Sequence, residues 1–369
     1  MLEVAIVGGG LSGLALASRL IEAGWSAIGL FEADARLGGR ILSTAAQGED
    51  ADARFDLGPT WLWPADQVQL GDFVRRHTIQ LFPQFQRGNS PVLSERGGRP
   101  YRLPDSQAYS GAYRIQGGAI RLIEAQQQTV PDELIYREHR LVAVSKRPEG
   151  VQLTLLHRGR EISVLAKRVV LSLPPRLLQQ SVRFEPALDP RFAELLAATP
   201  TWMAGHAKAI ACYSQPFWRE AGLSGNTFAH YPGAILGEIF DACSGAAGSP
   251  AALGGFFALP APLRRRFRDD LPALVIEQLG QLFGEAALHP VAVHIKDWSD
   301  EPLTATAADV DIPPSHPQYG HRWLSLDHWE ERLWFSGSET DSQFGGYLEG
   351  ALRAAARVAE ELCGGGHLR

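Results

Sequence analysis

The sequence predicts an α/β fold in two domains. The first reason is length, because 369 residues exceed one minimal core and suggest about two domains of ~150 residues each. The second is composition, because 45% hydrophobic and 21% charged residues are typical of a folded globular protein and exclude a disordered chain. The third is the opening of the chain, where an apolar run, a glycine turn, a helical pattern and a second apolar run follow one another.

Charge and cysteine content narrow the possible partners. The net charge of -6 lacks the basic footprint that nucleic-acid binding requires, so we expect no nucleic-acid partner. The three cysteines are too far apart for a disulfide framework or a metal site, so we expect a cytoplasmic protein without a bound metal. No segment reaches the ~20 uninterrupted apolar residues of a membrane helix, so we expect no membrane partner. The oligomeric state is left open.

The N-terminal segment has the order of a nucleotide-binding unit. Leu2–Val7 is an apolar run typical of a buried parallel strand. Gly8-Gly9-Gly10-Leu11-Ser12-Gly13 follows as a G-x-G-x-x-G, and apolar residues then recur at helical spacing until Gly24. A second strand is expected over Ala27–Phe31 and is followed by Glu32.

Each residue of this turn has a physical task. Gly8 permits the sharp turn from strand to helix, Gly10 lets backbone N–H groups approach a pyrophosphate, and Gly13 lets helix and strand pack closely. The phosphates then lie at the positive end of the helix. Glu32 lies about 20 residues beyond the turn, where an acid accepts hydrogen bonds from ribose hydroxyls. An acid favours a ribose 2′-OH over a 2′-phosphate, which indicates FAD or NAD rather than NADP.

A second glycine pair follows the second strand. Gly38 and Gly39 precede Arg40, so this loop can bring backbone close to a diphosphate with Arg40 as a charge-assisted donor. A solvated loop arginine is the alternative from these residues alone.

Taken together, these and later motifs resemble one known family. The sequence is similar to the flavin-containing amine oxidases of the monoamine oxidase and polyamine oxidase type. The resemblance is carried, in order along almost the whole chain, by Gly8–Gly13, Glu32, Gly38–Arg40, Phe55–Gly58, Gly117–Gly118, Val169–Pro175, Lys208, Pro216–Trp218, Trp298, Gly337–Glu339 and Gly346–Ala351.

The resemblance implies a two-domain flavoprotein. Its Rossmann-like FAD-binding domain would be assembled from separated segments, and its α+β substrate-binding domain would contain a mixed sheet. We expect the FAD-binding domain to comprise 1–66, 112–197 and 299–369, and the substrate-binding domain to comprise 67–111 and 198–298.

The resemblance also implies roles for single residues. Glu32 would hold the adenosine ribose and Arg40 the pyrophosphate. Val142 would contact the adenine through its backbone, and Gly58 would approach the flavin ring. Glu339 would reach the ribityl chain or the phosphates.

The last helical pattern begins near Gly345 and Gly346. Its apolar stripe predicts a packed helix without any analogy. The resemblance implies that its N-terminus, which carries roughly half a positive charge, points at the flavin.

The segment Trp202–Tyr213 is expected to be a strand. Period-two alternation places Lys208, His206, Ile210 and Cys212 on one face. From the residues alone, Lys208 is as compatible with a snorkelling position as with a buried one. The resemblance implies that Lys208 lies near the flavin and assists its reaction with O2. His206 is expected to be a hydrogen-bonded core histidine.

The chain departs from the monoamine oxidase pattern in one functional segment. Counting from Trp298 to Pro313–Pro314, the positions of the covalent flavin cysteine and of a cage tyrosine fall on Ala307 and Ala308. We therefore expect FAD to be held non-covalently. Tyr347 would be the remaining aromatic wall of the substrate pocket, with Phe344 nearby.

A second departure is length. Only Val68–Ala112, with a hairpin expected over Pro91–Pro104, stands where the family has a long helical insertion. The substrate pocket should therefore be shallower or more open, or be capped by a partner chain. Trp61, Trp63 and Trp202 are candidates for the missing walls, and the core is the alternative position for each. Arg264–Arg268 is expected to form a solvated helix face.

These observations lead to a predicted function. The chain would be an FAD-dependent oxidase that converts a small amine or amino acid to an imine and reduces O2 to H2O2. One alternative is an FAD-dependent oxidoreductase for a non-amine substrate, either desaturase-like or renalase-like. The other is a flavoprotein that binds FAD without turnover.

Overall fold

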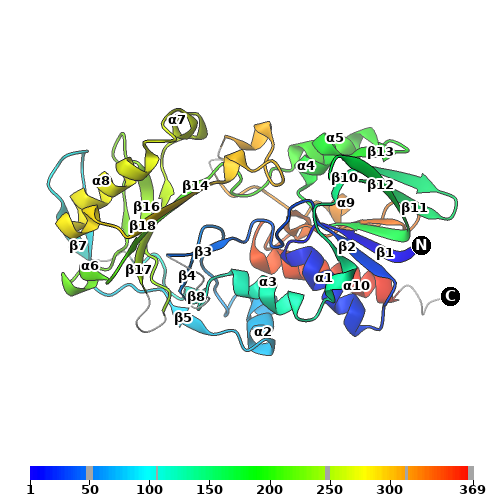
Figure 1. The fold of residues 1–369 in the computed structure, drawn as a ribbon, viewed down its shortest axis with the longest axis horizontal. Helices are drawn as coiled ribbons and strands as arrows, with labels where there is room; N and C mark the ends of the chain where they lie inside the picture. Colours follow the sequence, from blue (N-terminus) through cyan, green and yellow to red (C-terminus); the bar gives the residue numbers. More distant parts are fainter. Residues whose placement is uncertain (47–52, 105–106, 246–249, 312–314, 365–369) are drawn as a thin grey trace.

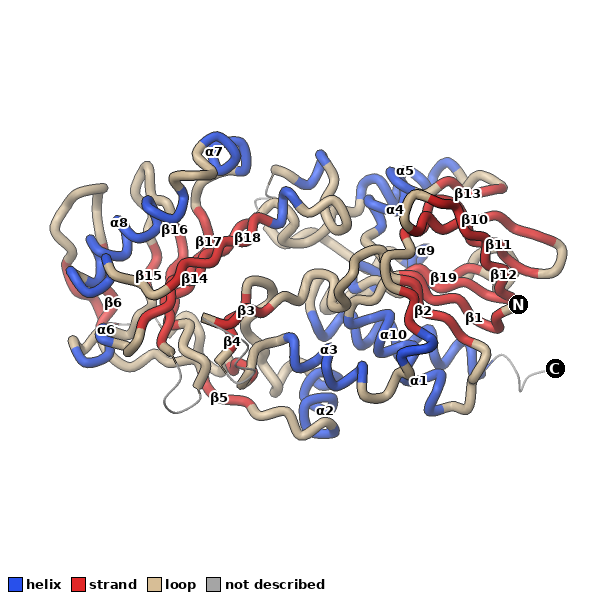
Figure 2. The backbone as a smooth tube through the Cα atoms, viewed as in Figure 1, coloured by secondary structure: helices blue, strands red, loops and turns tan. Residues whose placement is uncertain are grey.

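A computed structural model describes residues 1–46, 53–104, 107–245, 250–311 and 315–364. Two sheets lie towards opposite ends of an elongated molecule (Figure 1). Figure 2 shows them as two separate groups of strands joined by loops and short helices. Pro313–Pro314, from which the positions of Ala307 and Ala308 were counted, lie outside the described residues.

The first sheet has eight strands and contains a parallel Rossmann-like half. Its parallel strands lie in the order β19, β12, β1, β2, β9. Their bounds are β1 (Leu2–Val7), β2 (Ile28–Phe31), β9 (Ile135–Tyr136), β12 (Arg160–Leu171) and β19 (Leu333–Phe335). Strands from both ends of the chain therefore pair with the same central strand, which confirms a domain built from discontinuous segments.

The other half of this sheet continues from the long strand β12. The first part of β12 pairs antiparallel with β11 (Gly150–His157), while its last residues pair parallel with β1 and β19. β10 (Arg140–Arg147) and β13 (Arg183–Glu185) complete this edge.

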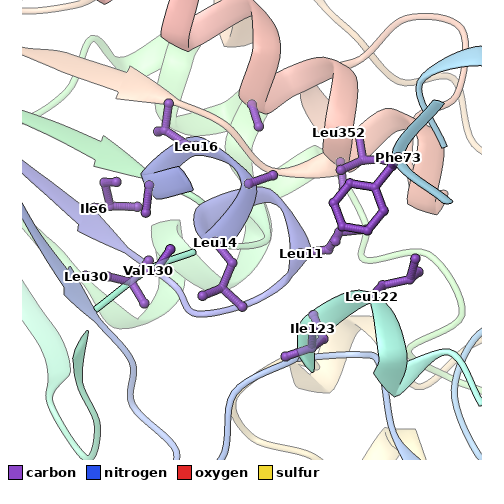
Figure 3. Close-up of a cluster of buried hydrophobic side chains, with 14 of the residues drawn as sticks. Ile6, Leu11, Leu14, Leu16, Leu30, Phe73, Leu122, Ile123, Val130 and Leu352 are labelled. Atoms are coloured by element: carbon purple, nitrogen blue, oxygen red, sulfur yellow. The ribbon is translucent and has the colours of Figure 1, made fainter. Parts of the chain in front are cut away.

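Helices cover the parallel half and form its main core. α1 (Leu11–Glu22), α3 (Ile120–Gln127) and α10 (Leu348–Gly364) pack together against the strands. Their apolar side chains form the cluster drawn in Figure 3, in which Leu14 of α1 and Leu352 of α10 are labelled.

Helix α2 (Val68–Arg76) joins the same core. Its Leu70, Phe73 and Val74 are buried in the cluster, and Figure 3 draws Phe73 next to Leu352. The expected boundary after residue 66 therefore differs from the structure at this helix, which packs on the nucleotide-binding side because its apolar face meets α10.

The second sheet has five strands, all paired antiparallel. They lie in the order β15 (Thr227–Phe228), β16 (Leu236–Asp241), β17 (Ala251–Phe257), β14 (Ala207–Tyr213) and β18 (Ala292–Asp297). The mixed pairing that was expected here occurs instead in the eight-stranded sheet. One face of this sheet packs on α8 (Leu271–Phe283), which contributes Val275 and Leu279 to the core.

Strand β14 has the expected alternation but begins later than expected. Ala209 and Ala211 belong to the core below α8, whereas Ile210 and Cys212 belong to a different cluster on the opposite face. Residues 202–205 form turns, and pairing with the neighbouring strands starts at Ala207.

Smaller elements complete the described chain. Three two-stranded pairs are formed by β3 (Ser43–Ala45) with β4 (Arg54–Asp56), β5 (Leu81–Pro83) with β8 (Tyr113–Ile115), and β6 (Asn89–Val92) with β7 (Tyr101–Pro104). The third pair confirms the expected hairpin. The remaining α-helices are α4 (Pro175–Ser181), α5 (Pro190–Ala198), α6 (Phe217–Glu220), α7 (Ala261–Arg266) and α9 (Arg322–Ser325). Among the described residues, no helix has the length and apolar character needed to span a membrane.

Candidate functional site

A cavity of about 850 Å³ extends from the glycine turn of the Rossmann-like half to the antiparallel sheet. Its volume is typical of sites that bind a large ligand. Its lining includes the sequence-predicted residues Gly8, Gly10, Ser12, Glu32, Arg40, Gly58, Trp61, Trp202, Lys208, Gly346 and Tyr347. The structure thus brings together residues that lie more than 300 positions apart in the sequence.

The glycine turn has the geometry that its sequence predicts. Gly8 has φ +107, and a Cβ on Gly8 would lie 2.6 Å from the carbonyl oxygen of Ser172. A Cβ on Gly13 would lie 2.0 Å from the carbonyl oxygen of Gly8, so Gly13 serves helix–strand packing and does not line the cavity. A Cβ on Gly10, in contrast, would meet no protein atom within 4 Å. Gly10 therefore borders space that a ligand can fill.

Helix α1 begins directly at this space. Gly10 is its N-cap, and no side chain caps its first N–H groups. The first N–H groups of a helix carry partial positive charge and bind anions when a ligand supplies them. The hydroxyl of Ser12 is held instead by the backbone carbonyl of Ser336, which ties α1 to the segment after β19.

Glu32 is fixed by backbone donors at the end of β2. Its Oε2 accepts a hydrogen bond from the N–H of Gly9 at 2.6 Å, and its Oε1 accepts one from Asp34 at 2.8 Å. Burial raises the pKa of Glu32, and these backbone hydrogen bonds oppose that shift. A carboxylate has about four acceptor positions. Glu32 can therefore still accept hydrogen bonds from a ligand in the cavity.

The partly exposed Arg40 forms an ion pair with the buried Glu339. Arg40 Nη1 donates to Glu339 Oε1 at 2.7 Å, and Nη2 donates to the hydroxyl of Ser338 at 3.0 Å. Arg40 and Ser338 line the cavity, whereas Glu339 lies behind them with an exposed fraction of 0%. This position makes Glu339 a partner that orients Arg40, and the expected direct contact between Glu339 and the ligand stays a prediction.

Lys208 lies at the other end of the cavity with an exposed fraction of 2%. Its Nζ donates hydrogen bonds to the carbonyl oxygen of Gly58 and to Thr60 Oγ1, both at 2.5 Å. It also lies 4.7 Å from the centre of the Phe256 ring. Burial lowers the pKa of Lys208 to about 7, although the charge of Asp56 opposes this. The buried alternative of the sequence analysis is therefore the observed one.

Aromatic side chains form the walls near Lys208. Trp202 and Tyr347 line the cavity, and both rings contact the imidazole of His316. Trp61 also lines the cavity, and its Nε1 donates a hydrogen bond to Gln84. Tyr347 stays 41% exposed, so this end of the cavity is partly open.

Helix α10 begins beside these walls. Gly346 has φ +82, and a Cβ there would lie 2.7 Å from Trp202 Cβ. Gly346, Tyr347 and Leu348 all line the cavity, so the N-terminus of α10 faces it as expected.

Two expected site residues lie away from the cavity lining. Phe344 is packed below the guanidinium of Arg353. Val142 sits at an irregularity of β10, and the adjoining cavity lining is formed by Arg140 and Leu141 instead. Their assigned roles stay predictions.

Two expectations about single side chains were wrong. His206 lines the cavity and its buried Nδ1 has no hydrogen-bond partner, so it is not a hydrogen-bonded core histidine. Burial lowers the pKa of His206 to about 4, with Arg264 contributing. Arg264 itself is 1% exposed rather than solvated, because Asp297 of β18 binds its guanidinium at 2.7 Å.

The sequence analysis also missed Glu238 of β16, which lines the cavity. Burial raises the pKa of Glu238, while a hydrogen bond from Tyr109 and the charge of Lys208 oppose the shift. A single acid within the apolar run Leu236–Phe240 was the available signal. No cysteine occurs among the described cavity-lining residues, and neither Ala307 nor Ala308 belongs to them.

The fold and the cavity define a two-domain dinucleotide-binding protein with an aromatic pocket beside a buried lysine. The model of the family "Flavin containing amine oxidoreductase" matches residues 85–363, and that of the NAD(P)-binding Rossmann-like domain matches residues 6–77. The chain belongs to the flavin-containing amine oxidoreductase family.

Named relatives agree with this membership. A flavin-containing amine oxidase of Danio rerio is 30% identical over 259 residues, which are 69% of this chain and 48% of the relative. A putrescine oxidase of Kocuria rosea is 32% identical over 219 residues, which are 56% of this chain and 42% of the relative. The chain thus spans about half the length of the curated relatives it matches.

Solved structures show the same fold at low identity. Putrescine oxidase bound to putrescine superposes with a TM-score of 0.78 at 19% identity, covering 98% of this chain and 99% of that one. Cyclohexylamine oxidase from Brevibacterium oxydans has a TM-score of 0.74 at 19% identity, again covering 98% of this chain and 99% of that one.

Proposed function

We propose that this chain is an FAD-dependent oxidase that holds FAD non-covalently and converts a small amine or amino acid to an imine. Bound FAD would supply the redox chemistry, as acceptor of a hydride equivalent from the carbon that bears nitrogen and as donor of the electrons that reduce O2 to H2O2. The observation that carries this proposal is one continuous cavity joining the glycine turn and Glu32 to the buried Lys208. Membership of the flavin-containing amine oxidoreductase family supports it.

The residues at the glycine turn fit the nucleotide half of FAD. The open space at Gly10 and the uncapped N-terminus of α1 suit a diphosphate. Arg40 would add a charge-assisted donor, oriented by Glu339. Glu32 would accept hydrogen bonds from the adenosine ribose. The role of the Val142 backbone at the adenine belongs to the same proposal.

The residues at the other end fit the flavin ring and the substrate. Gly58 and Gly346 border the cavity with backbone alone, which allows a flat ring to approach closely. The N-terminus of α10 adds positive potential at the same place. Trp61, Trp202 and Tyr347 would exclude water and orient an apolar substrate, with Phe344 supporting the Tyr347 segment.

Lys208 is the proposed catalytic residue. Its ammonium is held by two neutral oxygens, those of Gly58 and Thr60, so its charge is not cancelled by a hydrogen-bonded carboxylate. A preorganised cation in a buried cavity stabilises negative charge that develops beside it. Lys208 would in this way promote the reaction with O2. A neutral substrate amine needs no protein base, and the proposal assigns none.

The absence of a cysteine from the described cavity lining supports non-covalent binding. The test is the visible spectrum of the purified protein followed by acid denaturation. Yellow colour should leave with the supernatant, and colour in the precipitate would contradict the proposal. A colourless protein that does not bind added FAD would refute the flavoprotein assignment itself.

Catalysis is tested by anaerobic bleaching and peroxide release with a panel of amines and amino acids. Lys208→Met should slow reoxidation of the reduced protein by O2 by about 100-fold. Lys296→Met is the matched control, because Lys296 pairs with Lys208 in the sheet but bonds to Glu301 and does not line the cavity. Equal reoxidation rates in Lys208→Met and wild type would refute the assigned role.

The same panel decides between the alternatives. Ala307 and Ala308 contribute no aromatic wall to the described cavity, and this favours testing carbocycles and dihydronicotinamides beside amines. Turnover of those compounds alone would support the desaturase-like or renalase-like alternative, and FAD binding without bleaching would support a non-catalytic flavoprotein.

The free cysteines Cys212, Cys243 and Cys363 support the proposed cytoplasmic location.

A further inference from the structure

Glu238 reaches the cavity because strand β16 is irregular. The register of β16 against β17 shifts between Leu236 and Glu238, so Gly237 acts as an extra residue. As a result Leu236 and Ile239 both pack into the core below α8, whereas Glu238 and Phe240 face the other side. Irregularities of this kind re-aim side chains and are common beside functional sites.

Glu238 lies in one cross-strand row with Lys208. Phe256 of β17 pairs with Glu238 on one side and with Lys208 on the other. Paired residues of neighbouring strands share a face, and all three line the cavity. Strands lie ~4.8 Å apart, which separates the Cα atoms of Glu238 and Lys208 by about 10 Å. The cavity floor therefore has a carboxylate at one side, a phenyl ring in the middle and an ammonium at the other side.

The carboxylate of Glu238 forms no ion pair within the described residues, although the charge of Lys208 in the same row acts on it. Tyr109 donates a hydrogen bond to its Oε1 at 2.6 Å. Two other acids of the cavity lining are paired, Asp34 with Arg36 and Glu301 with Lys296. A partly buried carboxylate without a cation is costly unless a ligand compensates it.

Two aromatic residues adjoin Glu238, because Tyr109 bonds to it and Phe256 pairs with it across the strands. The ring of Trp61 stacks on Tyr109 at 4.8 Å between centroids and lies 6.2 Å from Phe256. The space next to the carboxylate is thus apolar along its length and acidic at its end. This arrangement suits a short alkyl chain that ends in a protonated nitrogen.

We propose that Glu238 binds a second, protonated nitrogen of the substrate, so that the preferred substrates are short diamines. This inference rests on the proposed amine oxidase function. It goes beyond it by naming the substrate class and the residue that selects it.

The charge pattern of the floor also orients such a substrate. The end of the cavity at Lys208 is buried, and Lys208 is hydrogen-bonded there to the neutral oxygens of Gly58 and Thr60, so an ammonium is disfavoured at that end, whereas Glu238 favours one at the far end. The nitrogen near Lys208 is therefore bound in its neutral form, which is the form that gives up a hydride equivalent from the adjacent carbon. The distant nitrogen keeps its proton.

The experiment compares matched substrates in the wild-type holoenzyme and in Glu238→Gln. Putrescine and cadaverine are measured against butylamine and pentylamine by peroxide release, because each pair differs only in the terminal ammonium. Loss of a hydrogen bond to a charged group should lower kcat/KM for the diamines roughly 10- to 100-fold and leave the monoamines within about twofold. The amide of glutamine can still accept the hydrogen bond from Tyr109, so folding is retained.

Glu301→Gln is the matched control, because it removes another cavity carboxylate that already has a cation. It should keep the diamine preference. Thermal shifts with putrescine and butylamine provide a readout without turnover, since a ligand raises the melting temperature according to its affinity. Only putrescine should stabilise the wild type strongly, and Glu238→Gln should lose this effect.

The outcomes separate the two proposals. A wild type that oxidises amines but treats diamines and monoamines alike overturns the role of Glu238 and keeps the amine oxidase function. An equal loss for both substrate classes in Glu238→Gln also overturns it, because that result indicates a general structural effect. Absence of amine turnover refutes the proposed function, and the thermal shifts then decide whether Glu238 binds a diamine.

Discussion

The buried ammonium of Lys208 should make the stability of this protein depend on pH in a defined way. The pKa of Lys208 is lowered from 10.5 to about 7, mainly by burial. An unfolded chain keeps the proton up to about pH 10.5, whereas the folded protein releases it near pH 7. Between these values the unfolded state binds more protons, so the free energy of unfolding rises with pH.

The magnitude follows from the interval between the two pKa values. At 1.36 kcal/mol per pH unit, the full interval corresponds to about 5 kcal/mol. Lys208→Met removes the titrating group but keeps an apolar chain of similar length. The unfolding free energy of the wild type relative to this variant should be constant below about pH 6 and rise by up to ~1.4 kcal/mol per pH unit above pH 7. The hydrogen bonds of Lys208 to Gly58 and Thr60 add only a constant offset.

The assay is urea unfolding of both proteins between about pH 6 and pH 9, followed by tryptophan fluorescence. The difference in midpoint multiplied by a common m-value gives the difference in unfolding free energy at each pH. Lys167→Met is the control, because the side chain of Lys167 is 54% exposed. This substitution therefore removes no buried ammonium. Parallel pH profiles for wild type and Lys208→Met would refute the depressed pKa and the argument built on it.

Three further predictions concern single contacts. Gly10→Ala should leave the melting temperature of the FAD-free protein nearly unchanged and should weaken FAD binding in a titration. Gly13→Ala should instead destabilise the fold, because its Cβ would lie 2.0 Å from a carbonyl oxygen. Glu339→Ala should lower the unfolding free energy by about 3 kcal/mol in a denaturant titration, since it leaves a guanidinium without its partner. Arg264→Met should lower the unfolding free energy by about 3 kcal/mol in the same assay, because it leaves the carboxylate of Asp297 unpaired. For either variant, a loss of unfolding free energy below about 1 kcal/mol would contradict the ion-pair assignment.

The nucleotide end of the site was predictable because its determinants are local. The turn from β1 to α1 needs a positive φ at Gly8 and no Cβ at Gly13, and both requirements concern residues a few positions apart. The strand Leu2–Val7 has the bounds that its apolar run predicts. Glu32 follows the second strand, so its position relative to the turn is set by two adjacent parallel strands.

Long-range ion pairs were not predictable from local composition. Arg264 belongs to a run of charged residues typical of a solvated helix, yet Asp297 of a distant strand buries it. Glu339 follows a glycine and a serine, which is typical of a ligand-binding loop. Its carboxylate nevertheless binds Arg40 of another segment. In both cases the partner comes from another element, and sequence spacing contains no information about that encounter.

The sequence by itself determined the nucleotide-binding turn, the alternation of β14 and the membership of a flavin-containing family, because each depends on short motifs or on their order. Only the tertiary structure decided what faces the substrate. An extra residue at Gly237 turns Glu238 towards the cavity, and antiparallel pairing then aligns it with Phe256 and Lys208. These three residues stand on different strands within residues 207–257, so the charge pattern of the cavity floor exists only once the sheet has formed.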